Sequence, residues 1–212
     1  MSEPRIDSVV ATGKGDDGTT GLLYGGPRIA KDDPRTEAYG TIDEAVAALG
    51  IARAAIGERR RAGGIPPALD ALEPLLLRLQ RELFVVGAEL ATTPVAWDRL
   101  EDGRTRVSGG MVEALTSHVV GLEKEITMPR EFVVPGETPA SAGLELARTI
   151  IRRAERRAVS LGMAGLLPGE HLVPYLNRLA DLVWVMARAA EQAEARSSTP
   201  ARTAPGAVRN DQ

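Results

Sequence analysis

An eleven-residue stretch at positions 147–157, "ARTIIRRAERR", carries five arginines and a single acid. On a helix, Arg148, Arg152 and Arg156 share one stripe, because residues four apart lie above one another. A planar guanidinium presents paired N–H donors that match the oxygens of a phosphate group. The stripe therefore suits a polyphosphate ligand. The alternative is a solvated helix face, on which arginine stems cover apolar neighbours while the charged heads stay in water.

The remaining residues of this stretch help to weigh the two interpretations. Arg153 and Arg157 lie about one residue step around the helix, and Glu155 is the one acid near enough to offset the charge. Apolar residues occupy the other side, at Ala147, Ile150, Ile151, Ala154 and Ala158. The stripe therefore borders the core rather than pointing straight into solvent.

A second candidate lies in "YLNRLADLVWVMARAAEQ", residues 175–192. Asn177 and Asp181 share a helix face among leucines and valines. A polar side chain flanked by core positions usually has a hydrogen-bond partner. This partner is either an ordinary neighbouring helix, or a ligand or one of the arginines.

The glycine-rich segment "GKGDDG", residues 13–18, matches the dinucleotide pattern G-x-G-x-x-G. Its context does not fit that pattern, because no helix begins at the third glycine, and Asp16 and Asp17 would repel a pyrophosphate. One interpretation is a surface turn. The other is a backbone cradle for phosphates, with Lys14 as a point charge and the aspartates near a metal ion.

Composition excludes several classes of function. The 212 residues have a net charge of −3 and contain two histidines and no cysteine, which excludes disulfides and thiolate metal ligands. A pI near 5.6 and 3% aromatic residues argue against a nucleic-acid partner. There is no apolar run of membrane-spanning length and no signal-peptide core, so we expect a cytoplasmic protein without a membrane partner.

Helical periodicity and capping residues predict an all-α fold. Asp33 and Thr138 are N-caps followed by prolines at the first helical positions. Helices are expected at 34–57, 65–93, 109–127, 139–161 and 170–194, with Pro74 bending the second one. They predict a five-helix, ferritin-like up-and-down bundle. The expected organisation is a flexible N-terminus at 1–11, a single domain at 12–194 and a disordered tail at 195–212.

Several of these segments together resemble the PduO-type ATP:cob(I)alamin adenosyltransferase family. The resemblance runs in order from about residue 12 to 191, through "TGKGDDGTTGL", "KDDPRTEAYGTIDEAVAALGIAR", "RLQRELFVVGAELAT", "FVVPGETPASAGLELARTIIRRAERR" and "YLNRLADLVWVMAR". It implies a trimer of five-helix bundles with ATP bound between subunits. The implied reaction transfers the 5′-deoxyadenosyl group of ATP to the Co(I) of reduced cobalamin, giving adenosylcobalamin and triphosphate. Mg²⁺ would be bound through the ATP phosphates.

The resemblance also implies roles for individual residues. The ATP ligands matched by position are Thr12, Gly13, Lys14, Gly15, Thr20, Gly21, Lys31, Arg152, Arg153, Glu155, Arg156 and Asn177. Phe132 matches a phenylalanine that closes the lower face of the corrin ring, and Asp43 with Arg148 matches a salt bridge across the subunit interface. Phe132, Arg152 and Arg156 are the implied catalytic residues. A flavoprotein reductase and an adenosylcobalamin-dependent acceptor enzyme are the implied protein partners.

Four segments depart from the family pattern. The loop reads "VATGKGD", with Lys14 at a position where a threonine is usual, and "DEAVA" places Val46 at an asparagine position. "VPGET" puts Glu137 near the expected corrin side, and "ELFVVGAEL" differs from the family's "DLFDLGADL". The altered loop and Glu137 favour an alternative, a non-catalytic relative that holds ATP or adenosylcobalamin as a carrier or regulator. The complete set of arginines favours the enzyme.

Overall fold

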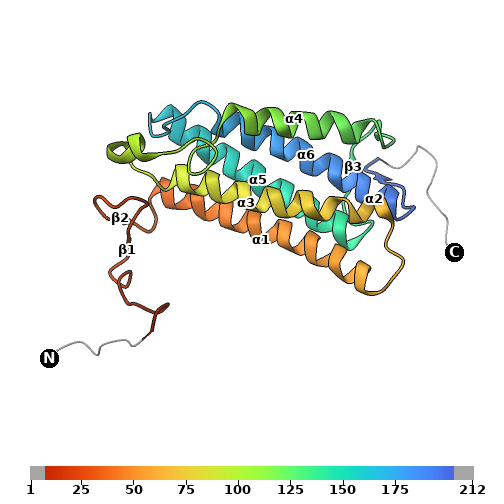
Figure 1. Ribbon diagram of the computed structural model, residues 1–212, viewed down its shortest axis with the longest axis horizontal. Coiled ribbons are helices and arrows are strands. Elements are labelled where there is room, and N and C mark those ends of the chain that lie inside the picture. The colour runs from red at the N-terminus through yellow and green to blue at the C-terminus, as the bar shows by residue number, and fades with distance from the viewer. Residues whose placement is uncertain (1–7, 203–212) are drawn as a thin grey trace.

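The computed structural model describes residues 8–202, and this part of the chain is mostly helical (Figure 1). Its α-helices are α1 (Pro34–Arg61), α2 (Pro67–Asp70), α3 (Leu72–Leu90), α4 (Gly109–Glu123), α5 (Pro139–Met163) and α6 (Leu172–Ala193). A 3₁₀ helix, Pro94–Arg99, follows α3. Two short antiparallel strand pairs complete it: β1 (Thr19–Thr20) with β2 (Ile29–Ala30), and β3 (Val133–Val134) with β4 (Thr199–Pro200). The predicted helical fold class is confirmed.

The two predicted helix starts have the expected caps. The Asp33 carboxylate accepts a hydrogen bond from the Arg35 backbone N–H at 2.8 Å, and Pro34 opens α1. At α5, Thr138 and Ser141 exchange hydrogen bonds between side chain and backbone at 3.1 Å each, which forms a capping box. Such caps satisfy N–H groups that have no partner inside the helix. The site-bearing helix α5 therefore starts at a well-defined residue.

The single helix expected at 65–93 is instead two helices, α2 and α3, separated at Ala71. Pro74 explains the break, because it has no N–H to donate to the carbonyl of Asp70 and its ring crowds that carbonyl. Pro74 then sits in the first turn of α3, where a missing N–H costs little. The expected bend is therefore a break, after which a new helix begins at Leu72.

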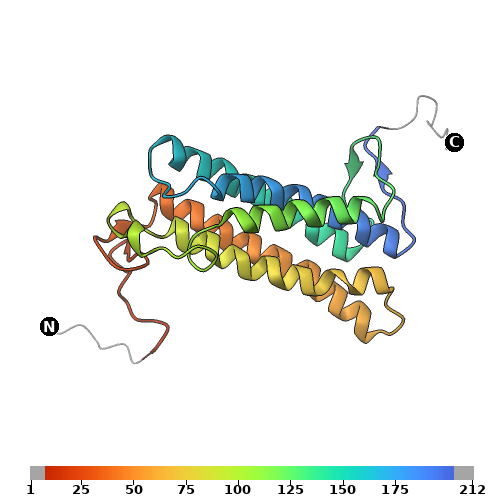
Figure 2. The ribbon, with the colours of Figure 1, turned by 45° about the horizontal axis from the view of Figure 1, so that its top comes forward.

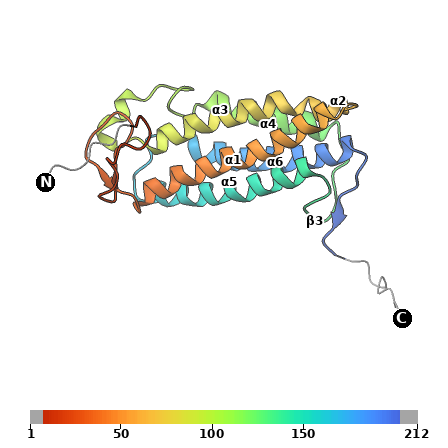
Figure 3. The ribbon, with the colours of Figure 1, turned by 90° about the horizontal axis from the view of Figure 1, so that it is seen from below.

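Helix α1 packs against α5 and α3, while α6 packs against α5 and α4 (Figures 2 and 3). Small residues bring α1 and α5 together. A Cβ at Gly143 would lie only 2.9 Å from the backbone nitrogen of Ala52. Leucines from four helices fill the core, including Leu49, Leu76, Leu79, Leu83, Leu144, Leu176 and Leu179. Burial of this surface is the main force that holds the helices in place.

The two ends of the bundle carry different irregular segments. The glycine-rich segment with β1 and β2 lies at the end where α1 begins, and β3 with β4 lies at the opposite end (Figure 1). The predictions of a flexible 1–11 and a disordered 195–212 partly fall on 1–7 and 203–212, outside the described residues. Within the tail, Thr199–Pro200 forms strand β4, because Val133 and Val134 offer it backbone partners. Among residues 8–202, no helix combines the length and apolar character needed to cross a membrane.

Candidate functional site

Three adjoining cavities follow the surface of α5 and α6. The first, of about 620 Å³, is lined by Pro129, Arg130, Glu131, Phe132, Val133, Glu145, Arg148, Trp184, Ala201 and Arg202. The second, of about 530 Å³, shares Arg148 and Trp184 with the first. The third, of about 370 Å³, shares Arg152 with the second. Because neighbouring cavities share lining residues, they form one groove from Phe132 to Arg156, which we call the α5–α6 groove.

The arginine end of the groove brings together four of the predicted site residues. Arg152, Glu155, Arg156 and Asn177 line it, together with Val159. Both Arg152 and Arg156 are exposed, so their guanidinium groups are accessible to a ligand. Arg156 Nη1 donates to the Arg152 carbonyl oxygen at 3.0 Å, and Asn177 Nδ2 donates to Glu155 Oε1 at 3.1 Å. The hydrogen-bond partner expected for Asn177 is therefore an acid on the arginine helix.

The other two arginines of α5 turn towards α1. Arg153 forms an ion pair with Glu44, and Arg157 Nη2 lies 2.7 Å from Glu37 Oε1. A step of one residue rotates a side chain by about 100° around a helix, which separates these arginines from the groove. Arg153 was matched to the ATP ligands, yet in a single chain it contacts α1 and does not line the arginine end. Its Nη2 is the nitrogen that pairs with Glu44.

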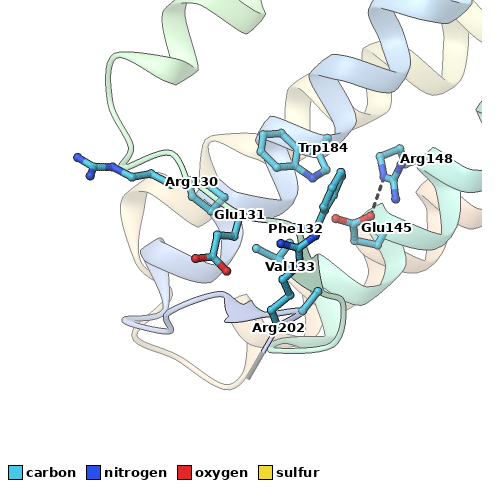
Figure 4. Close-up of a pocket in the computed structure, with 10 residues that line it drawn as sticks. Arg130, Glu131, Phe132, Val133, Glu145, Arg148, Trp184 and Arg202 are labelled. Carbon is cyan, nitrogen blue, oxygen red and sulfur yellow. Dashed lines mark hydrogen bonds and ion pairs between the residues drawn. The ribbon is translucent and has the colours of Figure 1, made fainter. Parts of the chain in front are cut away.

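The aromatic end of the groove is built around Phe132, which is 86% exposed. Its ring points towards the space between Trp184 and Arg148 (Figure 4). Behind this space, the guanidinium of the buried Arg188 lies 5.6 Å from the centre of the Trp184 ring. The result is an open pocket with aromatic walls and a charged rim.

Two residues of the groove were missed by sequence reasoning. Trp184 lies seven residues after Asn177 and three after Asp181, so it lies on the same face of α6. Glu145 precedes Arg148 by three residues, and its Oε2 accepts a hydrogen bond from Arg148 Nε at 2.7 Å. The same spacing rule that found the arginine stripe would have found both residues.

The predicted interface pair is not joined within one chain. Asp43 is exposed on α1, while Arg148 pairs with Glu145 on its own helix. Exposed apolar side chains lie on the same two helices, with Ile51 54% and Leu146 47% exposed. Asp43 forms no ion pair among residues 8–202, so its carboxylate is accessible to another molecule.

The glycine-rich segment, Thr12 to Lys31, is held by hydrogen bonds of its own, whether it serves as a surface turn or as a cradle for phosphates. Arg28 holds it together, because its Nη2 donates to the carbonyl oxygens of Lys14 at 2.6 Å and Thr19 at 2.9 Å. Gly15 leaves room for the Lys31 ammonium, which lies 3.0 Å from where a Cβ on Gly15 would be. Hydrogen bonds from the backbone and hydroxyl of Thr19 lower the pKa of Asp17.

The loop residues and the arginines remain apart in a single chain. Among residues 8–202, no hydrogen bond or ion pair joins the Thr12–Lys31 segment to the arginine end. The matched loop residues, Thr12, Gly13, Lys14, Gly15, Thr20, Gly21 and Lys31, therefore form a separate part of the candidate site. The segment is anchored elsewhere, since the Leu23 N–H donates to the Ala91 carbonyl at 2.9 Å and Arg99 stacks on Tyr24 at 4.3 Å.

Comparisons with known proteins agree with this geometry. Residues 10–190 match the family described as Cobalamin adenosyltransferase. A corrinoid adenosyltransferase of Citrobacter freundii is 38% identical over 182 residues, covering 86% of this chain and 94% of that protein. The corresponding protein of Bacillus subtilis is 37% identical over 177 residues, covering 84% and 83%. A solved variant of a PduO-type ATP:corrinoid adenosyltransferase from Lactobacillus reuteri, complexed with cobalamin and ATP, superposes with a TM-score of 0.76. It is 27% identical and covers 92% of this chain and 99% of its own.

Proposed function

The chain belongs to the cobalamin adenosyltransferase family, and from this premise we propose that it transfers the 5′-deoxyadenosyl group of ATP to the Co(I) of a reduced corrinoid. The observation that carries the proposal is the α5–α6 groove, which connects an arginine end to an aromatic end through Arg148, Arg152 and Trp184. One substrate of the reaction is a polyphosphate and the other is a large, mostly apolar ring. The arginine end offers charged donors for the polyphosphate, and the aromatic end offers apolar surface for the ring.

The arginine end suits the leaving group. Co(I) attacks C5′ with an electron pair that becomes the Co–C bond, and the C5′–O bonding pair leaves with triphosphate. Negative charge therefore grows on the phosphate chain as the bond breaks. Arg152 and Arg156 offer bidentate donors to this charge, and such donors lower the barrier when their contact strengthens in the transition state. Glu155 and Asn177 hold the edge of this end through their own hydrogen bond.

The aromatic end suits the corrin. Co(I) is already a strong nucleophile, so the protein needs to supply position and exclusion rather than a base. Phe132 has no atom that could coordinate cobalt, and its ring points into the pocket. We propose that it keeps water and the lower axial ligand away from cobalt, which favours reduction to Co(I). Trp184 would form a second apolar wall.

We further propose that the site is completed by a neighbouring copy in a trimer. The Thr12–Lys31 segment carries Lys14 and Lys31 but lies apart from the arginine end of its own chain. Asp43 and Arg148 are both accessible for a contact between chains. Light scattering of the purified protein should give three times the monomer mass, and a monomer at micromolar concentration would contradict this assembly.

The remaining partners follow from the chemistry. Mg²⁺ is a hard cation that ATP phosphates bind directly, so we expect it to enter with the nucleotide. Reduction of Co(II) requires an electron donor, for which we propose a flavoprotein reductase, and an adenosylcobalamin-dependent enzyme would accept the product. Both steps are expected in the cytoplasm. The carrier alternative gains no support from Glu137, because its carboxylate accepts a hydrogen bond from Thr199 Oγ1 at 2.5 Å.

Anaerobic turnover tests the function directly. Chemically reduced cobalamin and ATP are mixed with the protein, and formation of the Co–C bond is followed by absorbance while triphosphate is quantified. We expect both products in equal amounts over many turnovers. A carrier or regulator would bind the ligands and release no triphosphate.

A further inference from the structure

A buried group of charges lies directly behind the aromatic end of the groove. Arg188 on α6 is fully buried, and its Nη2 lies 3.1 Å from Glu145 Oε1 and 2.8 Å from Glu191 Oε1. Glu145 also accepts the hydrogen bond from Arg148 at the groove wall. Two acids and two arginines therefore balance one another. Glu145, Arg188 and Glu191 are buried and Arg148 is partly exposed at the groove wall, and we call these four residues the buried charge cluster. Buried charges persist only when each has a partner, so the positions of all four are linked.

One nitrogen of Arg188 makes both ion pairs. Its Nε and Nη1 have no hydrogen-bond partner among residues 8–202. The guanidinium also lies over the Trp184 ring, a wall of the groove. A change at Arg188 would therefore release Glu145, and with it Arg148, and would remove the group that backs Trp184.

The same cluster holds the segment that follows α6. Ser198 Oγ donates to Glu191 Oε2 at 2.5 Å. The next residues form β4, which pairs with β3, and the Ala201 N–H donates to the carbonyl oxygen of Phe132 at 2.7 Å. Residues 198–201 thus fasten the backbone of Phe132 to the buried charges of α6. We call them the C-terminal strap.

We propose that Arg188 is a positioning residue for adenosyl transfer. It holds two parts of the groove in place, one through each of its acid partners. Through Glu145 it fixes Arg148 at the groove wall, and through Glu191 and Ser198 it fixes the strap that places Phe132. The proposal rests on the function proposed above, since Phe132 needs a defined position only if a corrin lies against it. An exposed aromatic ring with no fixed backbone would leave the lower face of the corrin open to water.

Two variants of different severity test the proposal in the full-length protein. Arg188→Gln removes the central charge, and Ser198→Ala removes one partly buried hydrogen-bond donor to Glu191 and should leave the fold intact. Ser117→Ala, an exposed serine on α4, is the matched control. The affinity for cob(II)alamin is titrated by absorbance in the presence of ATP, and the affinity for ATP is measured separately. The absorbance change that reports loss of the lower axial ligand is recorded in the same titration.

We expect Arg188→Gln to weaken cob(II)alamin binding about tenfold, and Ser198→Ala about threefold, with ATP affinity within about twofold of the unchanged protein. The lower-ligand signal should shrink in the same order, and Ser117→Ala should behave as the unchanged protein. Equal losses of ATP and corrinoid affinity would indicate general damage to the fold and would overturn the proposal. Unchanged corrinoid binding in both variants would overturn it as well.

Hydrogen exchange separates this proposal from the proposed function. Amide exchange across residues 130–135 should be faster in both variants than in the unchanged protein, whether or not the protein catalyses a reaction. If the unchanged protein gives no adenosylcobalamin while exchange still rises, the function fails and the fastening by Arg188 stands. If turnover is normal and exchange across 130–135 is unchanged in both variants, the positioning role of Arg188 is wrong.

Discussion

Two pairs of arginines on α5 differ in what they contact. Arg152 and Arg156 face the α5–α6 groove and are exposed, whereas Arg153 and Arg157 turn to α1 and pair with Glu44 and Glu37. All four share one helix and are interleaved along it. Their surroundings therefore decide which of them are available to a ligand. Residue type alone says little about function here, because the same guanidinium is open to a ligand on one face of α5 and pairs with an acid of α1 on the other.

The largest effect should follow removal of either groove arginine. We expect Arg152→Ala and Arg156→Ala each to lower kcat by about 10²- to 10³-fold, as loss of a transition-state donor typically does. ATP affinity should fall too, since the ground state shares part of the contact. Steady-state kinetics at saturating corrinoid measure both. If neither substitution changes turnover, the assignment of the groove to the triphosphate is wrong.

Glu89 is a buried acid without a cationic hydrogen-bond partner among residues 8–202, and it should make stability depend on pH. Glu89 accepts a hydrogen bond from the Val107 N–H at 2.7 Å, while its Oε1 has no partner among residues 8–202. Burial raises its pKa from 4.5 to about 7. The folded state therefore binds more protons than the unfolded state in this interval, so this group lowers stability as the pH rises from about 4.5 to about 7.

Glu89→Gln should remove that pH dependence. At pH 8 the free energy of unfolding of the variant should exceed that of the unchanged protein by up to about 3 kcal/mol, and at pH 5 the difference should fall below about 1 kcal/mol. Urea denaturation at both pH values measures it. Equal gains at pH 5 and pH 8 would show that the carboxylate is not the cause.

A smaller effect should follow a change of geometry without a change of charge. Arg152→Lys keeps the positive charge but replaces a two-pronged donor with a single ammonium. We expect about tenfold lower kcat than for the unchanged protein, which lies between arginine and alanine at this position. Full activity in Arg152→Lys would mean that charge alone is needed at the groove.

The smallest effect on kcat should come from substitutions of the two arginines that face α1. Arg157→Ala and Arg153→Ala should each change kcat by less than about threefold, and each should lower the free energy of unfolding by no more than about 1 kcal/mol, as partly exposed ion pairs do. Glu37→Ala and Glu44→Ala remove the acids that pair with Arg157 and Arg153, and they should change kcat and the free energy of unfolding by the same amounts. A loss in Arg153→Ala that Glu44→Ala does not share would place Arg153 at the nucleotide after all.

The sequence analysis predicted most of the fold because periodicity and caps are local. Asp33, Thr138 and the prolines after them lie where the helices begin. The break at Pro74 was expected only as a bend, since a sequence does not show whether a helix continues past a proline or restarts. β4 was missed because a serine- and proline-rich tail carries no strand pattern, and Val133, the partner of Pro200, lies 67 residues away in the sequence.

For the candidate site, the shared helix face of the groove arginines was predictable from the sequence, whereas the contacts between helices were not. Helical spacing placed Arg152 and Arg156 on one stripe, and the structure brings them together with Glu155 and Asn177. The same spacing could not exclude Arg153, because the partner that draws it away, Glu44, belongs to a different helix. The buried charge cluster was invisible for a related reason. Arg188 reads as an ordinary polar residue of an amphipathic helix until Glu145 and Glu191 are seen beside it.

The close approach at Gly143 limits how this protein can change over evolution. A methyl group has no room at this point, because the two nearest atoms of Ala52 are its backbone nitrogen at 2.9 Å and its Cα at 3.1 Å. Even alanine at 143 would push apart the two helices that orient all four arginines. Changes in substrate choice are therefore expected among the exposed side chains of the groove rather than at position 143.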